Sequence, residues 1–465
     1  MRRFPFLFVL VLSYAFSVLD RIFPKPVTLR QHLRQNLIVG LIVVCFITLF
    51  QDTESIRNSR EESIDWLINM NRGVDIVKGK ESVPFVYYDI DDKTQQLWGE
   101  PLYTPREKLA RLITKALDKR PAVLVVDVEL RKATNEDAGL LEVLKTHAAT
   151  ADAPMLILVQ SFRWNEGEAG RGNWVARPSF IDTSLPPSSR RLWASPLFEQ
   201  DKDGQYRRWR SWLSACSVEG TPMIVPSVQL SVLAVLAGDQ GISSLEQALQ
   251  SAAPRSCNEQ ASLAVSRILI GSTQIDVAAN AFTQRILFAF PRKLAADEVR
   301  PLVDFAGSKT RLLTILPAHA ITEGGLDPSL PPGHIAVIGA SNQDARDVHT
   351  TPLGLMSGSL ILINAIHSLI QHGQLAAPPI WVQLLTATLL LTAVSYIFMK
   401  FPSTFGTFVS LGALIVVLVP ASMYLFRYGI WLDFAFPIAA VKMFELTMGY
   451  LRKHVHDRKA PRNAH

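Results

Sequence analysis

The sequence predicts an α/β domain with a mixed, largely parallel sheet and flanking helices, held outside a membrane by one N-terminal and three C-terminal transmembrane helices. Apolar strand-like runs alternate with helix-like stretches between residues 83 and 160. Three further apolar runs near the C-terminus have about the 20 residues that a spanning helix needs. Charged residues make up only 19% of the 465 residues, which indicates membrane segments joined to a folded soluble part.

Four apolar segments are predicted to cross the membrane. They are residues 37–50, 380–399, 404–426 and 430–449. The last of them carries Lys442 and Glu445, which anchoring at the interface explains better than a proton relay. Residues 4–19 are also apolar, and the sequence leaves open whether they span the membrane, are cleaved or lie in the interface.

Basic residues set the expected orientation. Residues 1–36 end in a basic link, and the tail at 450–465 is basic as well. Because positive flanks stay on the cytoplasmic side, residues 51–378 are predicted to form a periplasmic domain of a bacterial inner-membrane protein. These flanks account for the net charge of +6, so membrane lipid is an expected partner and nucleic acid is not.

Strand-like and helix-like segments alternate in the first part of this domain. "VPFVYYDI" at 83–90 predicts a strand, and "PREKLARLITKALDK" at 105–119 predicts an amphipathic helix that begins at a proline. "AVLVVDVEL" at 122–130 is a second apolar strand, which completes a right-handed βαβ unit. A helix at 135–149 and a strand at 153–160 continue the pattern, and strands this apolar need helices on both faces.

The rest of the domain gives shorter signals. The predicted elements are loops and short strands at 161–220, a helix at 221–238, a strand meander at 267–290, a strand at 334–339 and a helix at 357–373. The last helix runs towards the first C-terminal membrane segment. It is therefore the expected link between the domain and the membrane.

"GHIAVIGASNQDARDVHTTPLG" at 333–354 places Ser341 in a turn where a nucleophile could stand. The turn lacks the second glycine of GxSxG, and neither GxGxxG nor GxxxxGK[ST] is present there. Asp347 and His349 lie close in sequence, which does not make a catalytic triad. A structural turn explains the stretch better, so neither an enzyme activity nor a cofactor is expected. A metal-assisted hydrolase ranks lowest among the functions considered.

Carboxylates lie at the ends of the predicted strands. In a parallel sheet these ends meet at one edge, where α/β proteins bind their ligands. The candidate ligand-binding residues are Asp89, Asp91, Arg106, Asp127, Glu129 and Asp347. The alternative, which is commoner for loop aspartates, is that they cap helices, bond loop amides and pair with the arginine.

Cys216 and Cys257 both fall in the predicted external domain, where oxidising conditions favour pairing. A disulfide between them would close a loop of roughly 40 residues and stabilise the fold by about 3–4 kcal/mol. Two buried free thiols are the alternative. No CxxC spacing is present, so such a bridge would be structural.

Several short motifs occur in the order found in the second type of CHASE domain, which the chain resembles from about residue 37 to 450. That domain is an extracellular sensory domain associated with cyclases and histidine kinases. The first motifs are "VPFVYYDIDDKTQQLWGEPLYTPREKLARLITKAL" and "RPAVLVVDVEL". The others are "IAVIGAS", Asp347, "TPLG" at 351–354, Gly358 and Asn364.

The sequence departs from the family in three respects. "PLYTPR" keeps Arg106 but lacks the family's tryptophan-rich stretch before it, and "LILI" replaces the histidine usually found before Asn364. We also expect no kinase or cyclase domain after the third C-terminal segment, where family members commonly carry one. The resemblance implies a sensor or adaptor for an unidentified external ligand that signals in trans through a separate cytoplasmic protein. A structural membrane subunit of an envelope complex is the alternative. The residues do not decide whether the chain forms a homo-oligomer.

Overall fold

The computed structural model describes residues 54–70, 82–166, 172–251, 256–257, 267–277, 284–292 and 301–375, with scattered positions between 382 and 431. They belong to two units, one of residues 1–67 and 376–465 and one of residues 68–375. In the described part of the chain, no helix combines the length and apolarity needed to cross a bilayer. The predicted segment at 37–50 lies outside the described residues, and the three C-terminal segments are described only in part.

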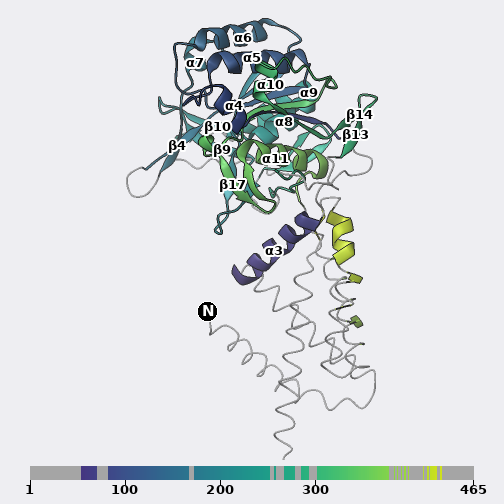
Figure 1. Ribbon diagram of the computed structural model, residues 1–465. Coiled ribbons are helices and arrows are strands. Elements are labelled where there is room, and N and C mark those ends of the chain that lie inside the picture. Colours follow the sequence, from purple (N-terminus) through teal and green to yellow (C-terminus); the bar gives the residue numbers. More distant parts are fainter. Residues whose placement is uncertain are drawn as a thin grey trace, which may run out of the picture. The chain divides into compact units, whose positions relative to one another are not determined.

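Unit 68–375 is built on a six-stranded sheet in which all neighbouring strands run parallel (Figure 1). The strand order is β15 (Leu313–Pro317), β1 (Phe85–Ile90), β16 (Ile335–Ala340), β2 (Val123–Asp127), β3 (Met155–Val159) and β6 (Arg191–Ala194). The predicted α/β class with a largely parallel sheet is therefore confirmed. Direct pairing within the predicted βαβ unit is wrong, because β16 lies between β1 and β2.

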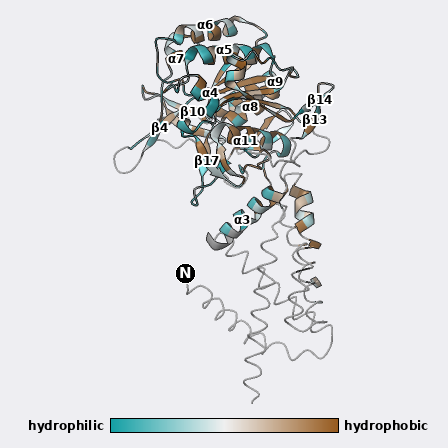
Figure 2. Ribbon diagram, in the orientation of Figure 1, coloured by the Kyte–Doolittle hydropathy of each residue, from teal (hydrophilic) through white to brown (hydrophobic). Residues whose placement is uncertain are grey.

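Helices cover both faces of this sheet (Figure 1). One face carries α4 (Asp92–Leu97), α5 (Arg106–Asp118), α6 (Asp137–Ala149), α7 (Phe180–Ser184) and α10 (Ala318–Thr322). The other face carries α8 (Val228–Leu236) and α11 (Gly358–His372), and α9 (Gly238–Ser251) packs on α8. The apolar residues gather in the strands and the helices against them, as Figure 2 shows. This double cover explains why the strands lack alternating polar residues.

The described residues of the unit also form a second, four-stranded sheet and four two-stranded ribbons. The sheet has the order β10 (Pro222–Pro226), β9 (Trp212–Cys216), β5 (Asn173–Ala176) and β4 (Phe162–Asn165). The ribbons are β7 (Phe198–Gln200) with β8 (Tyr206–Trp209), β11 (Arg267–Ile270) with β12 (Thr273–Asp276), β13 (Leu302–Phe305) with β14 (Ser308–Arg311), and β17 (Val348–Thr351) with β18 (Gly354–Ser357). A longer helix, α3 (Glu54–Met70), belongs to the other unit up to Leu67, and its last three residues begin unit 68–375.

The predicted helix at 221–238 begins later than expected. Residues Pro222–Pro226 form strand β10, which pairs with β9, and Ser227 caps the helix that follows by accepting from the Leu230 amide at 3.2 Å. Prolines are tolerated in this strand because β10 is at the edge of its sheet. The helical pattern is therefore restricted to α8.

The predicted strand meander at 267–290 is wrong in its last part. Residues 284–286 pair with β8, where the Ile286 amide donates to the Arg207 carbonyl at 2.8 Å, but helix α11 provides the partners for part of the buried backbone at 287–290. Asn364 Oδ1 accepts from the amides of Ala289 and Phe290, both at 2.8 Å, and Nδ2 donates to the Phe290 carbonyl at 3.0 Å. Ser368 Oγ accepts from the Leu287 amide at 3.0 Å. Polar side chains of a helix thus make the backbone hydrogen bonds that a neighbouring strand would otherwise make.

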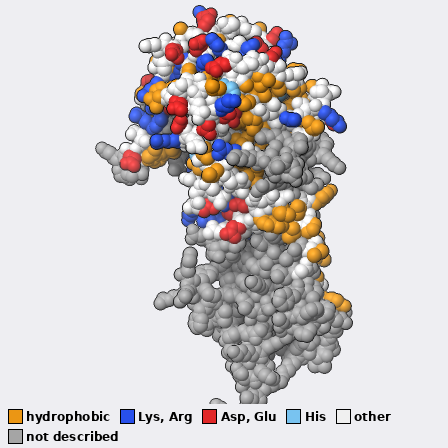
Figure 3. All heavy atoms as spheres, viewed as in Figure 1, with side chains coloured by type: hydrophobic (Ala, Val, Ile, Leu, Met, Phe, Trp, Pro, Cys, Tyr) orange, Lys and Arg blue, Asp and Glu red, His pale blue; other side chains and the backbone are white. Residues whose placement is uncertain are grey.

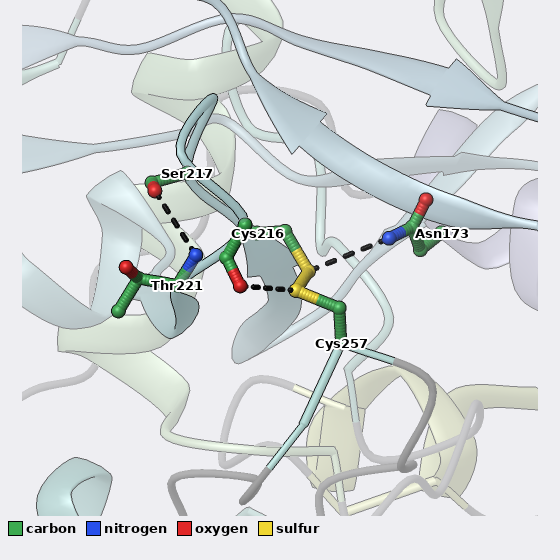
Figure 4. The surroundings of a disulfide bond; sticks show 6 residues. Asn173, Cys216, Ser217, Thr221 and Cys257 are labelled. Atoms are coloured by element: carbon green, nitrogen blue, oxygen red, sulfur yellow. Dashed lines mark hydrogen bonds between the residues drawn. A yellow bond between two sulfur atoms is a disulfide. The ribbon is translucent and has the colours of Figure 1, made fainter.

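Cys216, the last residue of β9, forms a disulfide with Cys257 (Figure 4). Asn173 Nδ2 lies 3.4 Å from Cys216 Sγ, and the Gly220 carbonyl oxygen lies 3.2 Å from Cys257 Sγ. The bridge joins residues 41 apart in sequence, for which chain entropy gives a stabilisation of about 4 kcal/mol. It ties the second sheet to the segment that follows α9.

Candidate functional site

Strands β1, β16 and β2 end side by side and place two carboxylates on the same face. Asp89 is in register with Gly339, and Gly339 is in register with Asp127. Paired residues of a parallel sheet point to the same side, and side chains alternate along each strand. Because Val86 and Val126 belong to the core under α5 and α6, the two carboxylates lie on the opposite face, which α11 covers.

Two glycines bring the start of α11 against this edge. A Cβ on Gly339 would overlap Ser359 Oγ and lie 2.7 Å from Ser359 Cβ. A Cβ on Gly358 would overlap Asp347 Oδ2 in the same way. The close approach allows Ser359, in the first turn of α11, to donate from Oγ to Asp127 Oδ2 at 2.7 Å. The carboxylate at the end of β2 is thus bonded directly to the helix.

Both strand-end carboxylates are held in surroundings that favour the protonated form. Burial raises the pKa of Asp89 to about 6, although Ser341 Oγ donates to its Oδ2 at 2.9 Å and lowers the value. Burial also raises the pKa of Asp127 to about 6, and the negative charge of Asp347 adds to this, while the Ser359 hydroxyl acts in the opposite direction. Ser341, considered above as a nucleophile, is here a donor to a carboxylate.

A cavity of about 440 Å³ opens at the same edge. It lies within the range of roughly 300–1,000 Å³ that is usual for small-molecule sites. The residues that line it follow β2, β3 and β16, and the loop at 102–104 adds to the wall. Its charged lining residues are Asp127, Glu129, Arg131, Arg177, Asp344 and Asp347. Among the described residues, no group of three or more His, Cys, Asp or Glu is arranged to hold a metal ion.

Three of the six residues proposed from the sequence line this cavity: Asp127, Glu129 and Asp347. Asp89 lies two strands away from Asp127 and does not line it. Asp91 is the N-cap of α4, and its Oδ1 accepts from the Thr94 amide at 2.8 Å and the Thr94 hydroxyl at 2.6 Å. The structure therefore brings only half of the set together.

Arg106 does not line the cavity but supports the backbone of the segment that does. Its side chain is 2% exposed, and its Nε lies 3.2 Å from Asp137 Oδ1. The guanidinium donates to the carbonyl oxygens of Glu129 at 3.5 Å and Lys132 at 3.1 Å, and its Cζ lies 5.2 Å from the Phe180 ring centroid. These contacts hold the segment after β2 that carries the cavity residues, so Arg106 has a positioning role here.

Sequence reasoning missed Arg131, Arg177 and Ser359. The "SGS" at 357–359, directly before a predicted helix, was a signal for a close helix approach. No local signal pointed to Arg177, because it follows β5 in the second sheet.

The raised pKa values predict how stability depends on pH. The folded state binds protons at Asp89 and Asp127 more tightly than the unfolded chain, whose carboxyls titrate near 3.8. The free energy of unfolding should therefore fall as pH rises from about 4 to about 6 and level off above. Since both groups are partly exposed, we expect on the order of 1–2 kcal/mol from each.

Thermal unfolding of the full-length chain between pH 4.5 and 7.5 checks this. Asp127→Asn should flatten the pH dependence and raise the midpoint at pH 7.5 by several degrees, about 2–4 °C per kcal/mol. Asp152→Asn, in the exposed turn before β3, is the matched control and should leave the pH dependence unchanged. An unaltered slope in Asp127→Asn would contradict the assignment.

Comparison with known proteins identifies a domain family. The family model of the CHASE2 domain matches residues 39–397, most of the chain. No curated protein and no solved structure matches it.

Proposed function

The chain belongs to the CHASE2 domain family of sensory domains, and from this premise we propose that it is a membrane-bound extracytoplasmic sensor or adaptor. In this proposal the domain lies in the periplasm of a bacterial inner membrane and detects an external ligand. The three C-terminal membrane helices pass the change to a separate cytoplasmic signalling protein. The family assignment supports the sensory part, and the hydropathy of the C-terminal segments supports the membrane part.

The hydrogen bond between Asp127 and Ser359 carries the proposal. Asp127 lines the cavity, and Ser359 belongs to the first turn of α11. Helix α11 ends at His372, and the predicted membrane segment at 380–399 follows closely in sequence. One 2.7 Å contact thus joins the wall of a cavity to the helix that precedes the membrane segments.

A ligand can act through this contact only if it binds one arrangement of α11 more tightly than another. A cationic ligand group beside Asp127 and Asp347 would compete with the Ser359 hydroxyl for carboxylate oxygens. The start of α11 would then be released from β2. Where no ligand competes, the hydrogen bond from Ser359 to Asp127 holds the start of α11 against β2. Ligand binding in the cavity would in this way change the position of α11.

Co-purification of the full-length chain from native membranes in mild detergent tests the signalling proposal. Mass spectrometry should find a recurring kinase, cyclase or other cytoplasmic regulator. A variant with the basic residues of the tail at 450–465 replaced by serine is expected to lose that partner while keeping its fold. Recovery of the chain alone, or only with external envelope proteins, would contradict signalling in trans and favour a structural envelope subunit.

A further inference from the structure

The charged residues of the cavity at the carboxyl edge have both signs. The acidic ones are Asp127, Glu129, Asp344 and Asp347, and the basic ones are Arg131 and Arg177. We infer that the cavity binds a small zwitterion, a free α-amino acid or a short peptide, with its ammonium at the aspartates and its carboxylate at the arginines. This inference rests on the proposed sensory function and specifies the ligand class of the same site.

Three of the four acidic residues lie apart from Arg177, and the fourth, Glu129, lies beside the two arginines. Asp344, in the 3-10 turn at Gln343–Ala345, and Asp347 follow β16, while Asp127 ends β2. Arg177 lies on the other side, beyond β3, because its amide donates to the carbonyl oxygen of Ser161 at 2.9 Å. Along the order β16, β2, β3, the aspartates therefore come first and Arg177 last, with Glu129 and Arg131 following β2 between them. This polarity matches a ligand with opposite charges at its two ends.

The guanidiniums retain donors for a ligand carboxylate. Glu129 Oε1 lies 3.4 Å from Arg131 Nε and 3.8 Å from Arg177 Nη1. Both distances exceed the roughly 2.7–2.9 Å of a hydrogen-bonded ion pair. The side chains of the two arginines are 38% and 36% exposed, so water and solutes reach them. A planar guanidinium can bind a carboxylate through two parallel N–H bonds.

At the acidic end, Asp347 is 43% exposed, and its Oδ1 lies 2.8 Å from His349 Nε2. Asp127 lines the same cavity, so the two carboxylates offer several acceptor oxygens to an ammonium with its three donors. A dicarboxylate would be repelled by these aspartates, and a diamine would be repelled by the two arginines. The same cavity has apolar lining for an aliphatic side chain, from Leu102, Leu130, Val159 and Trp193.

Titration calorimetry on the full-length chain in lipid nanodiscs tests the inference. The probes are L-alanine, L-alanyl-L-alanine, its N-acetyl form, its C-terminal amide and putrescine. We expect a zwitterionic probe to bind and the loss of either charge to weaken binding at least about tenfold. Tighter binding of L-alanine would point to free amino acids, and tighter binding of the dipeptide to peptides. Equal binding of the blocked forms or of putrescine, or no binding by either zwitterion, overturns the inference.

Single substitutions test which residues bind the ammonium and which bind the carboxylate of the ligand. Asp347→Asn should weaken the dipeptide about tenfold without changing the N-acetyl form, and Arg177→Gln should weaken it without changing the amide. Asp152→Asn and Arg111→Gln, exposed and outside the cavity, are the matched controls. An unchanged unfolding midpoint verifies that each variant folds. Binding is read without any partner protein, so a failed co-purification leaves this result intact, and failed binding leaves the partner result intact.

Discussion

Replacement of Asn364 by alanine is expected to destabilise unit 68–375 by about 4 kcal/mol or more. The change removes the partners of the Ala289 amide and of the Phe290 amide and carbonyl, all in a buried segment. Each buried polar group left without a partner costs roughly 1–3 kcal/mol. Strand β8 does not take over in the described structure, because it pairs only with residues 284–286 of this segment.

Denaturant unfolding of the full-length chain in mild detergent, followed by tryptophan fluorescence, measures the loss. Asn135→Ala in the exposed turn before α6 is the matched control, with an expected change within about 0.5 kcal/mol. A loss below about 1 kcal/mol in Asn364→Ala would mean that the segment finds other partners. The expected result makes Asn364, one of the residues on which the family resemblance rests, a scaffold residue.

The elements that the sequence predicted well are those whose signal is local. Apolar runs specify β1, β2, β3 and β16, and a 3.6-residue periodicity with a starting proline specifies α5. The insertion of β16 between β1 and β2 depends on pairing over more than 200 residues, for which no local pattern exists. Strand β15 at the sheet edge was missed for a similar reason.

In the candidate site, too, local sequence signals identified some residues, whereas long-range packing decided the role of others. Carboxylates at strand ends were found because the carboxyl edge of a parallel sheet is a general place for ligands. Arg106 was predicted to be one of the ligand-binding residues. Its ion-pair partner, Asp137, lies 31 residues further along the chain, and in this pair Arg106 supports the segment after β2 instead. Arg177 reaches the cavity from the second sheet. Tertiary packing decides whether a side chain faces the cavity or supports its wall from outside. A single sequence does not show that packing.

The position of α11 depends on the absence of a side chain at Gly339, and Gly339→Ala is expected to cost about 3 kcal/mol. The new Cβ would overlap the Ser359 hydroxyl and lie 2.7 Å from Ser359 Cβ, so a rotamer change alone does not relieve it. Overpacking typically costs about 1–3 kcal/mol, and loss of a hydrogen bond to a charged group adds roughly 1.5–3 kcal/mol. Gly139→Ala on the exposed face of α6, with no atom within 4 Å, should be neutral or stabilising.

A double-mutant cycle with Ser359→Gly separates steric contact from general damage to the strand. Ser359→Gly removes the Cβ and Oγ that the new methyl group meets, so the double variant should be more stable than the sum of the single effects by about 1–2 kcal/mol. Additive losses would mean that Gly339 is needed for the strand and not for the helix contact. Coupling of the expected size would establish that the end of β16 and the first turn of α11 are in direct steric contact. Signalling from the cavity to α11 requires that contact.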